Sequence, residues 1–305
     1  MKNFAITGVA GFIAPRHLQA IKDTGNNLVA ALDVNDSVGI LDRYFPNASF
    51  FVEFERFERH LEHLRRKNHN EKIDYLSICV PNFLHDSHIR LALRVGADAI
   101  CEKPLVLNPW NLDVLEELEQ ETGKKVYTIL QLRVHPSLIT LKNQIDKEIQ
   151  LNPSRKYHVD LIYITGRGLW YDYSWKGIIE KSGGIATNIG IHLFDLLIWL
   201  FGEPLHSEVT LFEKRRMKGE LELKNAFVNW FLSLEFSDLP DGLFENGSTT
   251  YRSIKIEGQE IEFTKGFTEL HTELYRRILD GKGFGIKDAR PSIELVYKIR
   301  NNIKF

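Results

Sequence analysis

The sequence contains little cysteine, little net charge and no long uninterrupted apolar run. Cys79 and Cys101 are the only cysteines in 305 residues, and each lies in an apolar run typical of a buried strand, so we expect two reduced core thiols. Lysine and arginine number 39 against 41 aspartate and glutamate residues, a formal net charge of -2, which argues against a nucleic-acid surface or a polybasic membrane anchor.

Two further absences concern location. No apolar run reaches the roughly 18 residues that a membrane helix needs, and the N-terminus lacks the charged-then-apolar layout of a signal peptide. We therefore expect a cytoplasmic protein that acts on a small molecule, without nucleic acid or membrane as partner.

The length exceeds one typical domain, and the first part of the chain predicts an α/β fold. Short apolar runs at 3–7, 27–33, 49–53, 74–80, 98–102 and 125–130 alternate with amphipathic runs at 15–25, 57–67, 87–96 and 108–123, as strands and crossover helices of a parallel sheet do. We predict an N-terminal Rossmann dinucleotide-binding domain over residues 1–125.

The pattern changes in the second half of the chain. Runs at 156–165, 207–213, 227–236 and 253–264 favour strands, most of them with a period of two, and runs at 190–202, 268–281 and 291–301 favour helices. We predict a C-terminal α+β domain over residues 126–305, with a largely antiparallel open sheet that serves substrate binding and oligomerisation.

A glycine-rich turn, TGVAGFIA, follows the first predicted strand and opens the first helix. This context suits a pyrophosphate cradle, because a helix N-terminus offers free N–H groups and a positive dipole end. The candidate cofactor-binding residues in the turn are Gly8, Gly11, Phe12 and Ile13, and Ala14 stands where the usual fingerprint has a third glycine. Asp33 ends the second strand about 20 residues later, where an acid hydrogen-bonds the ribose 2′-hydroxyl, so NAD is favoured over NADP.

The same turn could open a short-chain dehydrogenase, which needs a Tyr-x-x-x-Lys pair on one helical face. Tyr251 and Lys255 have this spacing, but their surroundings alternate as a strand does, which would turn the two side chains away from a common helical face. The pair also lies outside the predicted dinucleotide-binding domain. We interpret it as a chance match.

Other motifs point to a different class. CEKPL at 101–105, GGIATNIGIHLFD at 183–195, VPNFLHDSHI and APRH resemble the Gfo/Idh/MocA family of NAD(P)-dependent sugar oxidoreductases over nearly the whole chain. More narrowly, GVAGFIAPRHLQAIKDTGN, SICVPNFLH, SWKG and GGIATNIGIH are similar to the WlbA/WbpB branch. That branch implies oxidation of the C3 hydroxyl of UDP-N-acetyl-2-amino-2-deoxyglucuronate to a ketone in bacterial surface-polysaccharide synthesis. One departure is Asn188, which stands where the family motif has its first acid and can only orient substrate.

The resemblance implies catalytic roles for Lys103 and His192. Oxidation of a secondary alcohol needs a group that accepts the hydroxyl proton, and an unperturbed histidine pKa near 6.5 suits a general base. Lys103 would polarise the hydroxyl or relay its proton, with a pKa lowered beside a cationic nicotinamide ring. Which of the two is the base stays open.

Further candidates follow from strand ends and from one polar loop. Residues at or just after predicted strand ends could contact the cofactor: Val80, Asn82, His85, Glu102, Lys103 and Gln131. The loop RGLWYDYSWKG offers cations and rings for the carboxylate and diphosphate of a sugar nucleotide, although a polar loop with aromatic packing explains it equally well. The substrate candidates are Arg167, Tyr171, Trp175, Lys176, Asn188 and His192.

The sequence supports a metal site and other functions less well. His60 and His63 share a helix face, but their run is a charged helix surface, so we predict no metal site. The alternatives to a UDP-sugar dehydrogenase are another sugar or polyol dehydrogenase of the same family and a non-enzymatic dinucleotide sensor. A sensor would need neither Lys103 nor His192.

The run FVNWFLSLEF is apolar at almost every position. We expect that Phe227, Trp230, Leu232 and Leu234 cannot all face the domain's own helices together with Val228, Phe231 and Phe236. An apolar sheet face left over in this way indicates a homo-oligomer, expected to be a tetramer, that assembles through this sheet. The alternative is that a helix of the same chain, such as the run at 291–301, covers the face.

Overall fold

The computed structural model describes residues 1–67, 71–261 and 269–304. The chain forms two compact units. The first consists of Met1–Gln131 and Phe267–Ala289, and the second of Leu132–Gly266 and Arg290–Phe305. A late segment of the chain therefore belongs to the first unit, and helix α11 (Ile286–Arg300) contributes to both.

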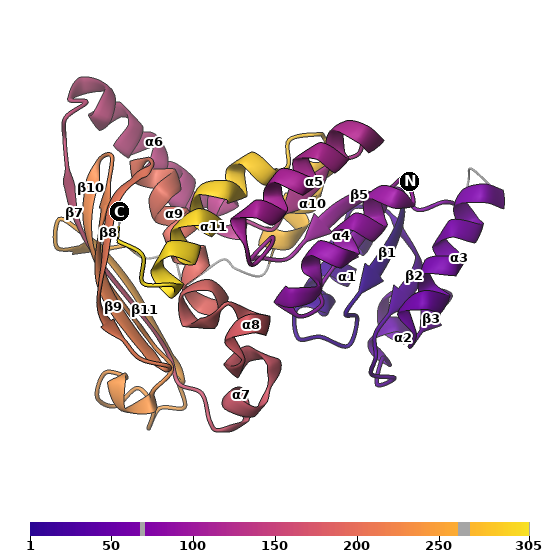
Figure 1. Cartoon of the computed structure of the whole chain (residues 1–305), viewed down its shortest axis with the longest axis horizontal. Helices are drawn as coiled ribbons and strands as arrows, with labels where there is room; N and C mark the ends of the chain where they lie inside the picture. Colours follow the sequence, from indigo (N-terminus) through magenta and orange to yellow (C-terminus); the bar gives the residue numbers. More distant parts are fainter. Residues whose placement is uncertain (68–70, 262–268, 305) are drawn as a thin grey trace. The chain divides into compact units, whose positions relative to one another are not determined.

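The first unit is built on a six-stranded parallel sheet in the order β3-β2-β1-β4-β5-β6 (Figure 1). This order confirms the predicted Rossmann fold, and each predicted strand is present. The central strands are buried along most of their length, as expected for a sheet covered on both faces. Their bounds are β1 Asn3–Thr7, β2 Asn27–Leu32, β3 Ser49–Phe51, β4 Tyr75–Ile78, β5 Asp98–Cys101 and β6 Val126–Thr128.

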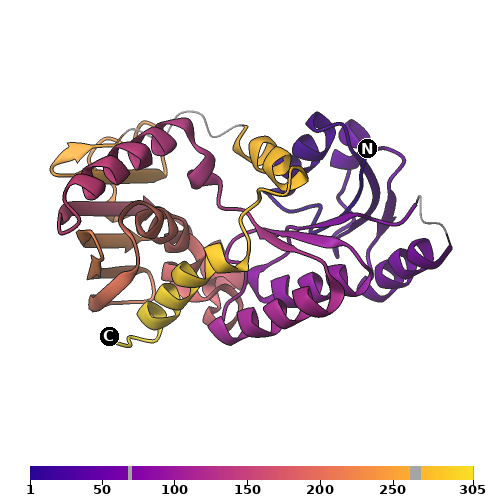
Figure 2. The ribbon, with the colours of Figure 1, turned by 90° about the horizontal axis from the view of Figure 1, so that it is seen from above.

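Helices lie on both faces of this sheet. Figure 2 shows α1 (Ala14–Asp23) beside α10 (Leu270–Leu279) on one face, with α4 (His85–Arg94) and α5 (Pro109–Thr122) on the other. Helix α10 comes from the far end of the sequence and packs against α1, so the Rossmann unit includes residues outside its N-terminal segment. The remaining helices of the unit before α10 are α2 Ile40–Tyr44, α3 Phe54–Lys67 and the 3-10 turn η1 Asn82–Leu84.

The second unit contains a six-stranded sheet in the order β12-β11-β7-β10-β9-β8. Strands β7 and β10 pair in parallel and all other neighbours pair antiparallel, which confirms the predicted, largely antiparallel sheet. Strand β9 was not predicted. Residues 262–264, at the end of the last predicted strand, lie outside the described residues. The bounds are β7 Tyr157–Thr165, β8 Pro204–Phe212, β9 Arg216–Leu223, β10 Ala226–Ser233, β11 Thr250–Ile256 and β12 Gln259–Glu260.

Helix α9 (Ile191–Phe201) forms much of the core of the second unit. The segment Ile179–Phe201 is long and apolar enough to span a membrane by length and composition, but 78% of its most apolar window is buried inside the protein. Phe194 packs edge-on against Trp230 of β10, with ring centroids 5.4 Å apart. The segment is therefore a core helix of this unit. The other helical elements are η2 Gln131–Val134, α6 Pro136–Leu151, α7 Trp170–Tyr173, η3 Trp175–Gly177, α8 Ile179–Ser182, η4 Ala186–Gly190 and η5 Phe236–Asp238.

Strand β10 confirms the expectation that its apolar residues do not all share one face. Val228, Trp230 and Leu232 all point to the buried side, with at most 2% exposure, and Leu234 just beyond the strand is also buried. Phe227 lies on the opposite face, 43% exposed, where its ring stacks near His158. The strand thus alternates regularly, because residues two apart share a face.

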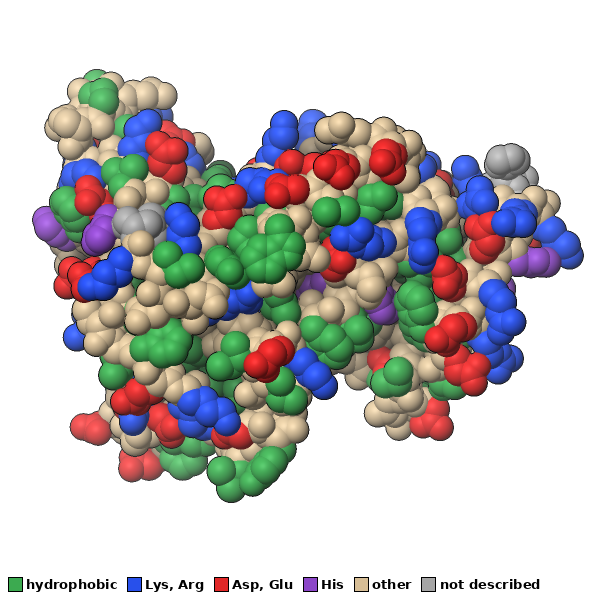
Figure 3. All heavy atoms as spheres, in the orientation of Figure 1, with side chains coloured by type: hydrophobic (Ala, Val, Ile, Leu, Met, Phe, Trp, Pro, Cys, Tyr) green, Lys and Arg blue, Asp and Glu red, His purple; other side chains and the backbone are tan. Residues whose placement is uncertain are grey.

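The outer face of this sheet is mixed in character. Beside Phe227 it carries polar contacts such as the hydrogen bond from Asn229 to Asp160 at 3.1 Å. Figure 3 shows acidic and basic side chains interspersed on the face of the molecule that it draws. Tyr251 and Lys255 lie in strand β11, which confirms the prediction that this pair is not on a helix.

Candidate functional site

Gly8 leaves strand β1 with a φ of +78°, a conformation that glycine adopts freely. A Cβ at this position would lie 2.5 Å from the carbonyl carbon and oxygen of Cys79 and 2.7 Å from the amide nitrogen of Val80. The loop therefore passes directly over the end of β4. Strand order reverses between β1 and β4, and ligands of open α/β sheets bind at such a point.

The loop after Gly8 presents backbone N–H groups at the start of α1. The N–H of Gly11 donates to the Gly8 carbonyl at 3.0 Å, and that of Ala14 donates to Gly11 at 3.2 Å. Within the described residues, the N–H groups of Phe12 and Ile13 form no hydrogen bond. Unsatisfied donors at a helix N-terminus attract anions, so this backbone fits the pyrophosphate of a dinucleotide.

Asp33 lies directly after β2 and contacts the same loop. Its Oδ2 accepts the N–H of Ala10 at 2.9 Å, and its Oδ1 accepts the N–H of Asn35 at 2.9 Å. These bonds fix the carboxylate beside the glycine loop, and each oxygen retains a lone pair that can accept a ribose hydroxyl. The geometry fits the role that the sequence predicted for Asp33.

Residues after β4 and β5 form the next part of the site. Nδ1 of the buried His85 lies 2.7 Å from the carbonyl oxygen of Pro104, and Nε2 lies 2.9 Å from that of Val80. Both ring nitrogens therefore contact the backbone and tie the two strand ends together. Burial lowers the pKa of His85. The contacts with the Pro104 and Val80 carbonyls oppose this shift, and the charge of Lys103 adds to it.

The structure brings the other strand-end candidates to the same edge of the sheet. Asn82 is buried at the start of η1 after β4, and Gln131 is half-buried at the start of η2 after β6. Lys103 is half-buried, and its backbone N–H donates to Oε2 of Glu102 at 3.3 Å. The carboxyl ends of parallel strands meet at one edge, so the predicted cofactor residues of this unit share that edge.

A cluster that the sequence analysis did not assign holds Glu102. Its Oε1 lies 3.0 Å from Nε2 of His17 and 3.0 Å from Nε2 of His271. All three side chains are buried, and their polar atoms lie within 4.8 Å of one another, close enough to hold a metal ion. His17 belongs to the APRH motif, but His271 lies in α10, and no local signal in the sequence points to it.

In the second unit, the predicted substrate residues lie near one another. Nδ2 of Asn188 donates to the hydroxyl oxygen of the buried Tyr171 at 2.8 Å. Burial raises the pKa of Tyr171, and the Asn188 bond and the charge of Arg167 oppose this rise. Burial lowers the pKa of Lys176, and the charge of Arg167 adds to that effect. The charge of Arg167 therefore acts on both Tyr171 and Lys176.

Aromatic rings surround the Lys176 ammonium group. Its Nζ lies 5.3 Å from the ring centroid of Trp170 and 5.7 Å from that of Trp175. Trp175 was predicted as a site residue and Trp170 was not. Rings that flank an ammonium group attract it through their π-faces, which offsets part of the desolvation that lowers the pKa of Lys176.

His192 follows Asn188 by one helical turn and is half-buried in α9. Asp195, the last acid of the same motif, is buried and forms a bidentate ion pair with Arg133 of η2, with distances of 2.7 and 2.9 Å. An Arg–carboxylate pair of this kind orients both side chains. Asp195 therefore anchors the helix that carries His192, a role that the sequence analysis did not assign.

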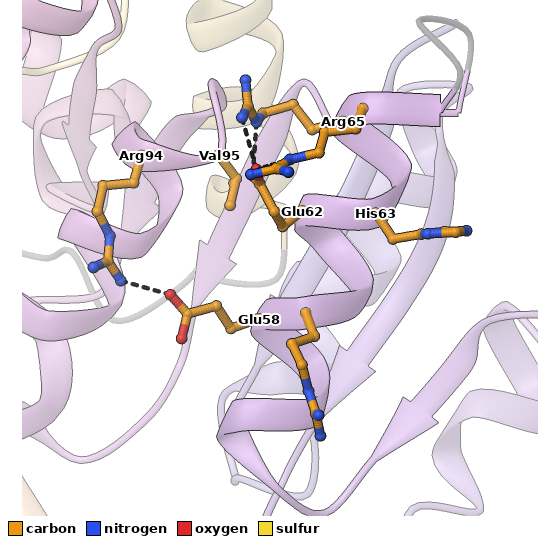
Figure 4. A pocket seen from close by; sticks show the side chains of 8 residues that line it. Glu58, Glu62, His63, Arg65, Arg94 and Val95 are labelled. Atoms are coloured by element: carbon orange, nitrogen blue, oxygen red, sulfur yellow. Dashed lines mark hydrogen bonds and ion pairs between the residues drawn. The ribbon is translucent and has the colours of Figure 1, made fainter.

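An open cavity of about 830 Å³ lies elsewhere in the first unit, against α3 and the end of α4 (Figure 4). Three of the four arginines that line it are paired: Arg65 and Arg66 with Glu62, at 2.7 and 2.5 Å, and Arg94 with Glu58 at 2.9 Å. Figure 4 shows His63 directed away from these acids. Crossover helices run opposite to the strands, so the ends of α3 and α4 lie at the sheet edge remote from the glycine loop, and we assign this cavity no part in the site.

A glycine loop at the switch point of a parallel sheet, with an acid after β2, defines a dinucleotide-dependent oxidoreductase. Comparison with known proteins gives the family. Residues 2–130 match the family model described as "Oxidoreductase family, NAD-binding Rossmann fold". Residues 145–290 match the model described as "Oxidoreductase family, C-terminal alpha/beta domain". The chain belongs to this Gfo/Idh/MocA family of NAD-binding oxidoreductases.

Solved structures give a more detailed likeness. The WlbA (WbpB) dehydrogenase from Thermus thermophilus, in complex with NAD and UDP-GlcNAcA, is 52% identical, with a TM-score of 0.93 over 98% of this chain and 95% of that one. The same enzyme in complex with NAD and alpha-ketoglutarate is 53% identical. The WlbA dehydrogenase from Bordetella pertussis, 20% identical with a TM-score of 0.77 over 98% and 94% of the chains, shows the shared fold.

Curated relatives match over shorter segments. Inositol 2-dehydrogenase from Rhizobium meliloti is 29% identical over 133 residues, which make up 43% of this chain and 37% of that protein. The chain matches less than half the length of the first three curated relatives, between 37% and 46%.

Proposed function

We propose that the chain oxidises the C3 hydroxyl of UDP-N-acetyl-2-amino-2-deoxyglucuronate to the 3-keto sugar with NAD, in the synthesis of a bacterial surface polysaccharide such as the O-antigen of lipopolysaccharide. The observation that carries this proposal is the 52% identity, over 98% of the chain, to a dehydrogenase solved with NAD and UDP-GlcNAcA. Bound NAD would supply the hydride acceptor, and the protein residues would bind the sugar and accept its proton.

In this proposal, Lys103 and His192 act on the C3 hydroxyl. One accepts the hydroxyl proton and the other donates a hydrogen bond that polarises the hydroxyl. Asn188 orients the sugar by hydrogen bonds. The Asp195–Arg133 pair supports this assignment indirectly, because it fixes the helix that carries His192.

We propose that Arg167 and Lys176 hold the anionic groups of the substrate, with Tyr171 and Trp175 shaping the subsite. The diphosphate and the carboxylate of a UDP-sugar acid are planar or compact anions that such cations bind. The lowered pKa of Lys176 gives this assignment a pH signature. Substrate affinity should decline as the pH rises through that lowered pKa, because the ammonium group then loses its charge.

Turnover with candidate substrates tests the proposal. Purified protein with NAD should produce NADH absorbance with UDP-GlcNAcA and not with free inositols or glucose 6-phosphate. Lys103→Ala and His192→Ala should each lower single-turnover rates on the order of 100-fold or more, with NAD binding nearly intact. Turnover of a free polyol alone would favour another dehydrogenase of the family, and NAD binding without any turnover would favour a sensor.

Reoxidation of NADH is a separate part of the proposal. Because the Thermus thermophilus enzyme was solved with NAD and alpha-ketoglutarate, we propose that a 2-oxo dicarboxylate is reduced to the 2-hydroxy acid and regenerates NAD on this chain. With NAD limited to one equivalent per chain, adding alpha-ketoglutarate to the UDP-sugar reaction should convert a single burst of keto-sugar formation into continuous turnover. A reaction that stops after one equivalent of NADH in its presence would contradict this step.

We propose further that the protein works in the cytoplasm as a homotetramer that associates through the outer face of the second unit's sheet. The exposed Phe227 and its neighbours on β10 support this assignment, although the face also carries polar pairs. Light scattering on dilute protein tests it, because a stable species of 35.3 kDa would be a monomer.

A further inference from the structure

Five buried polar side chains form one connected chain of hydrogen bonds at the end of β5. Ser77 Oγ lies 2.6 Å from the hydroxyl of Tyr275, which lies 2.7 Å from Nδ1 of His17. Nε2 of His17 and Nε2 of His271 each lie 3.0 Å from Oε1 of Glu102. All five residues are buried, with at most 8% of their surface exposed.

Hydrogen-bond chemistry fixes the direction of this chain. A carboxylate oxygen only accepts, so both histidines present an Nε2–H to Glu102. A neutral imidazole then has its lone pair on Nδ1, so Nδ1 of His17 must accept a hydrogen bond from the Tyr275 hydroxyl. The tyrosine oxygen in turn accepts from Ser77. Every donor along this path is matched by an acceptor.

The protonation states agree with this assignment. Burial alone would raise the pKa of Glu102, but hydrogen bonds from His17 and His271 lower it well below its usual range. Burial lowers the pKa of His17, so its ring is neutral, and burial raises the pKa of Tyr275, so its hydroxyl remains a donor. The titratable groups around Glu102 are His17 from α1, Cys79 after β4, His85 from α4, Cys101 of β5, Lys103 next in the chain, and His271 and Tyr275 from α10.

The chain of hydrogen bonds connects distant segments to Lys103. Glu102 accepts both histidines on Oε1 and the backbone N–H of Lys103 on Oε2. His17 comes from α1 and His271 from α10, a helix that follows all strands of the second unit's sheet in the sequence. The orientation of the Glu102 carboxylate, and with it the backbone of Lys103, therefore depends on both helices.

We propose that His17 and His271 are positioning residues, which hold the Glu102 carboxylate in a fixed orientation against the backbone of Lys103 and so set the geometry of the proposed catalytic lysine. This inference rests on the proposed function, because it assigns Lys103 a part in the reaction. It also gives the histidine of the APRH motif a role. A metal ion is disfavoured, because each N–O distance of 3.0 Å is that of an ordinary hydrogen bond.

Two substitutions at one position test the proposal. His271→Gln can keep an N–H donor near the position of Nε2, whereas His271→Leu removes it at similar volume. Without this donor the pKa of the buried Glu102 should rise, so that kcat falls on the acid side of the profile. We expect kcat of His271→Leu to drop on the order of tenfold at pH 6 and to recover toward pH 8, with KM for NAD unchanged. His271→Gln should keep the wild-type profile.

Equal pH profiles of kcat for His271→Leu and the wild-type enzyme would overturn the proposal. Equal losses of kcat in His271→Leu and His271→Gln, in proportion to their losses of thermal stability, would also overturn it. A second measurement does not depend on turnover. Nitrogen-15 NMR of the NAD-bound protein, labelled at histidine, should show His17 as a neutral Nε2–H tautomer from pH 6 to pH 8 and His271 with a proton on Nε2. An Nδ1–H tautomer at either position, or one bound metal ion per chain by elemental analysis, would refute the assignment. Absence of turnover with every UDP-sugar acid would refute the proposed function alone.

Discussion

Gly8→Ala should test two reasons for glycine at this position, namely its positive φ and its close approach to Cys79. At a φ of +78°, an alanine lowers the free energy of unfolding by about 1–2 kcal/mol through backbone strain. Its Cβ would also lie 2.5 Å from the backbone of Cys79, and overpacking of this kind typically costs about 1–3 kcal/mol. The combined loss of about 2–5 kcal/mol should lower Tm on the order of 10 °C.

The same substitution should weaken NAD binding. The end of β4 or the loop itself must shift to make room for the methyl group, and the loop carries the N–H groups of Phe12 and Ile13 that fit the pyrophosphate. Calorimetric titration with NAD, and thermal unfolding with and without NAD, measure the two effects. We expect a smaller stabilisation by NAD in the variant than in the wild-type protein.

Gly25→Ala is the matched control. Gly25 has a φ of +70°, close to that of Gly8, but no heavy atom of the described residues lies within 4 Å of the Cβ it would gain. This variant should lose only the backbone cost of about 1–2 kcal/mol and bind NAD normally. If Gly8→Ala lost no more stability than Gly25→Ala and kept full NAD affinity, the close approach to β4 would not matter and the reasoning would be wrong.

Three other substitutions test separate parts of the structure. Asp33→Ala should narrow the preference for NAD over NADP. Equal affinities of the wild-type protein for both cofactors would refute the role of Asp33 in cofactor selection. Asp195→Asn leaves the buried Arg133 without its charge partner and should cost about 3–5 kcal/mol in denaturant unfolding; a loss under 1 kcal/mol would contradict this. Burial lowers the pKa of His88 to about 4, so its contribution to stability is complete above pH 6.5 and is lost, by roughly 3 kcal/mol, as the pH falls from 6.5 to 4. His88→Phe should flatten that part of the stability profile, and an unchanged slope would refute the assignment.

The Rossmann unit was predictable because its signals are local. Each strand from β1 to β6 is a short apolar run between turn residues, and the glycine loop with Asp33 is a motif of fixed spacing. The membership of α10 in this unit was not predictable. Its helical pattern was evident, but nothing local indicates that residues after the second sheet return to pack on α1.

Strand β9 shows a second limit of the sequence. Gly219 lies in the middle of the strand, where glycine normally weakens a strand prediction. In the structure, a Cβ there would lie 2.3 Å from the Glu208 carbonyl oxygen and 2.6 Å from the Trp230 ring. The glycine is required by a backbone carbonyl of β8 and by a ring of β10, and this tertiary reason has no counterpart in the local pattern.

The two acids of the family motifs explain why site residues were only partly predicted. Glu102 and Asp195 are both buried, and a buried carboxylate requires charged or hydrogen-bonding partners. The sequence indicates the requirement, since both acids stand in apolar runs, but it does not identify the partners. For Glu102 one partner is His271, 169 residues away, and for Asp195 it is Arg133, 62 residues away. In each case the acid belongs to the same motif as a residue proposed for the chemistry, Lys103 or His192, and its partners fix that motif in place. A motif match thus indicates where the chemistry lies, and only the fold shows which of its residues hold the others in position.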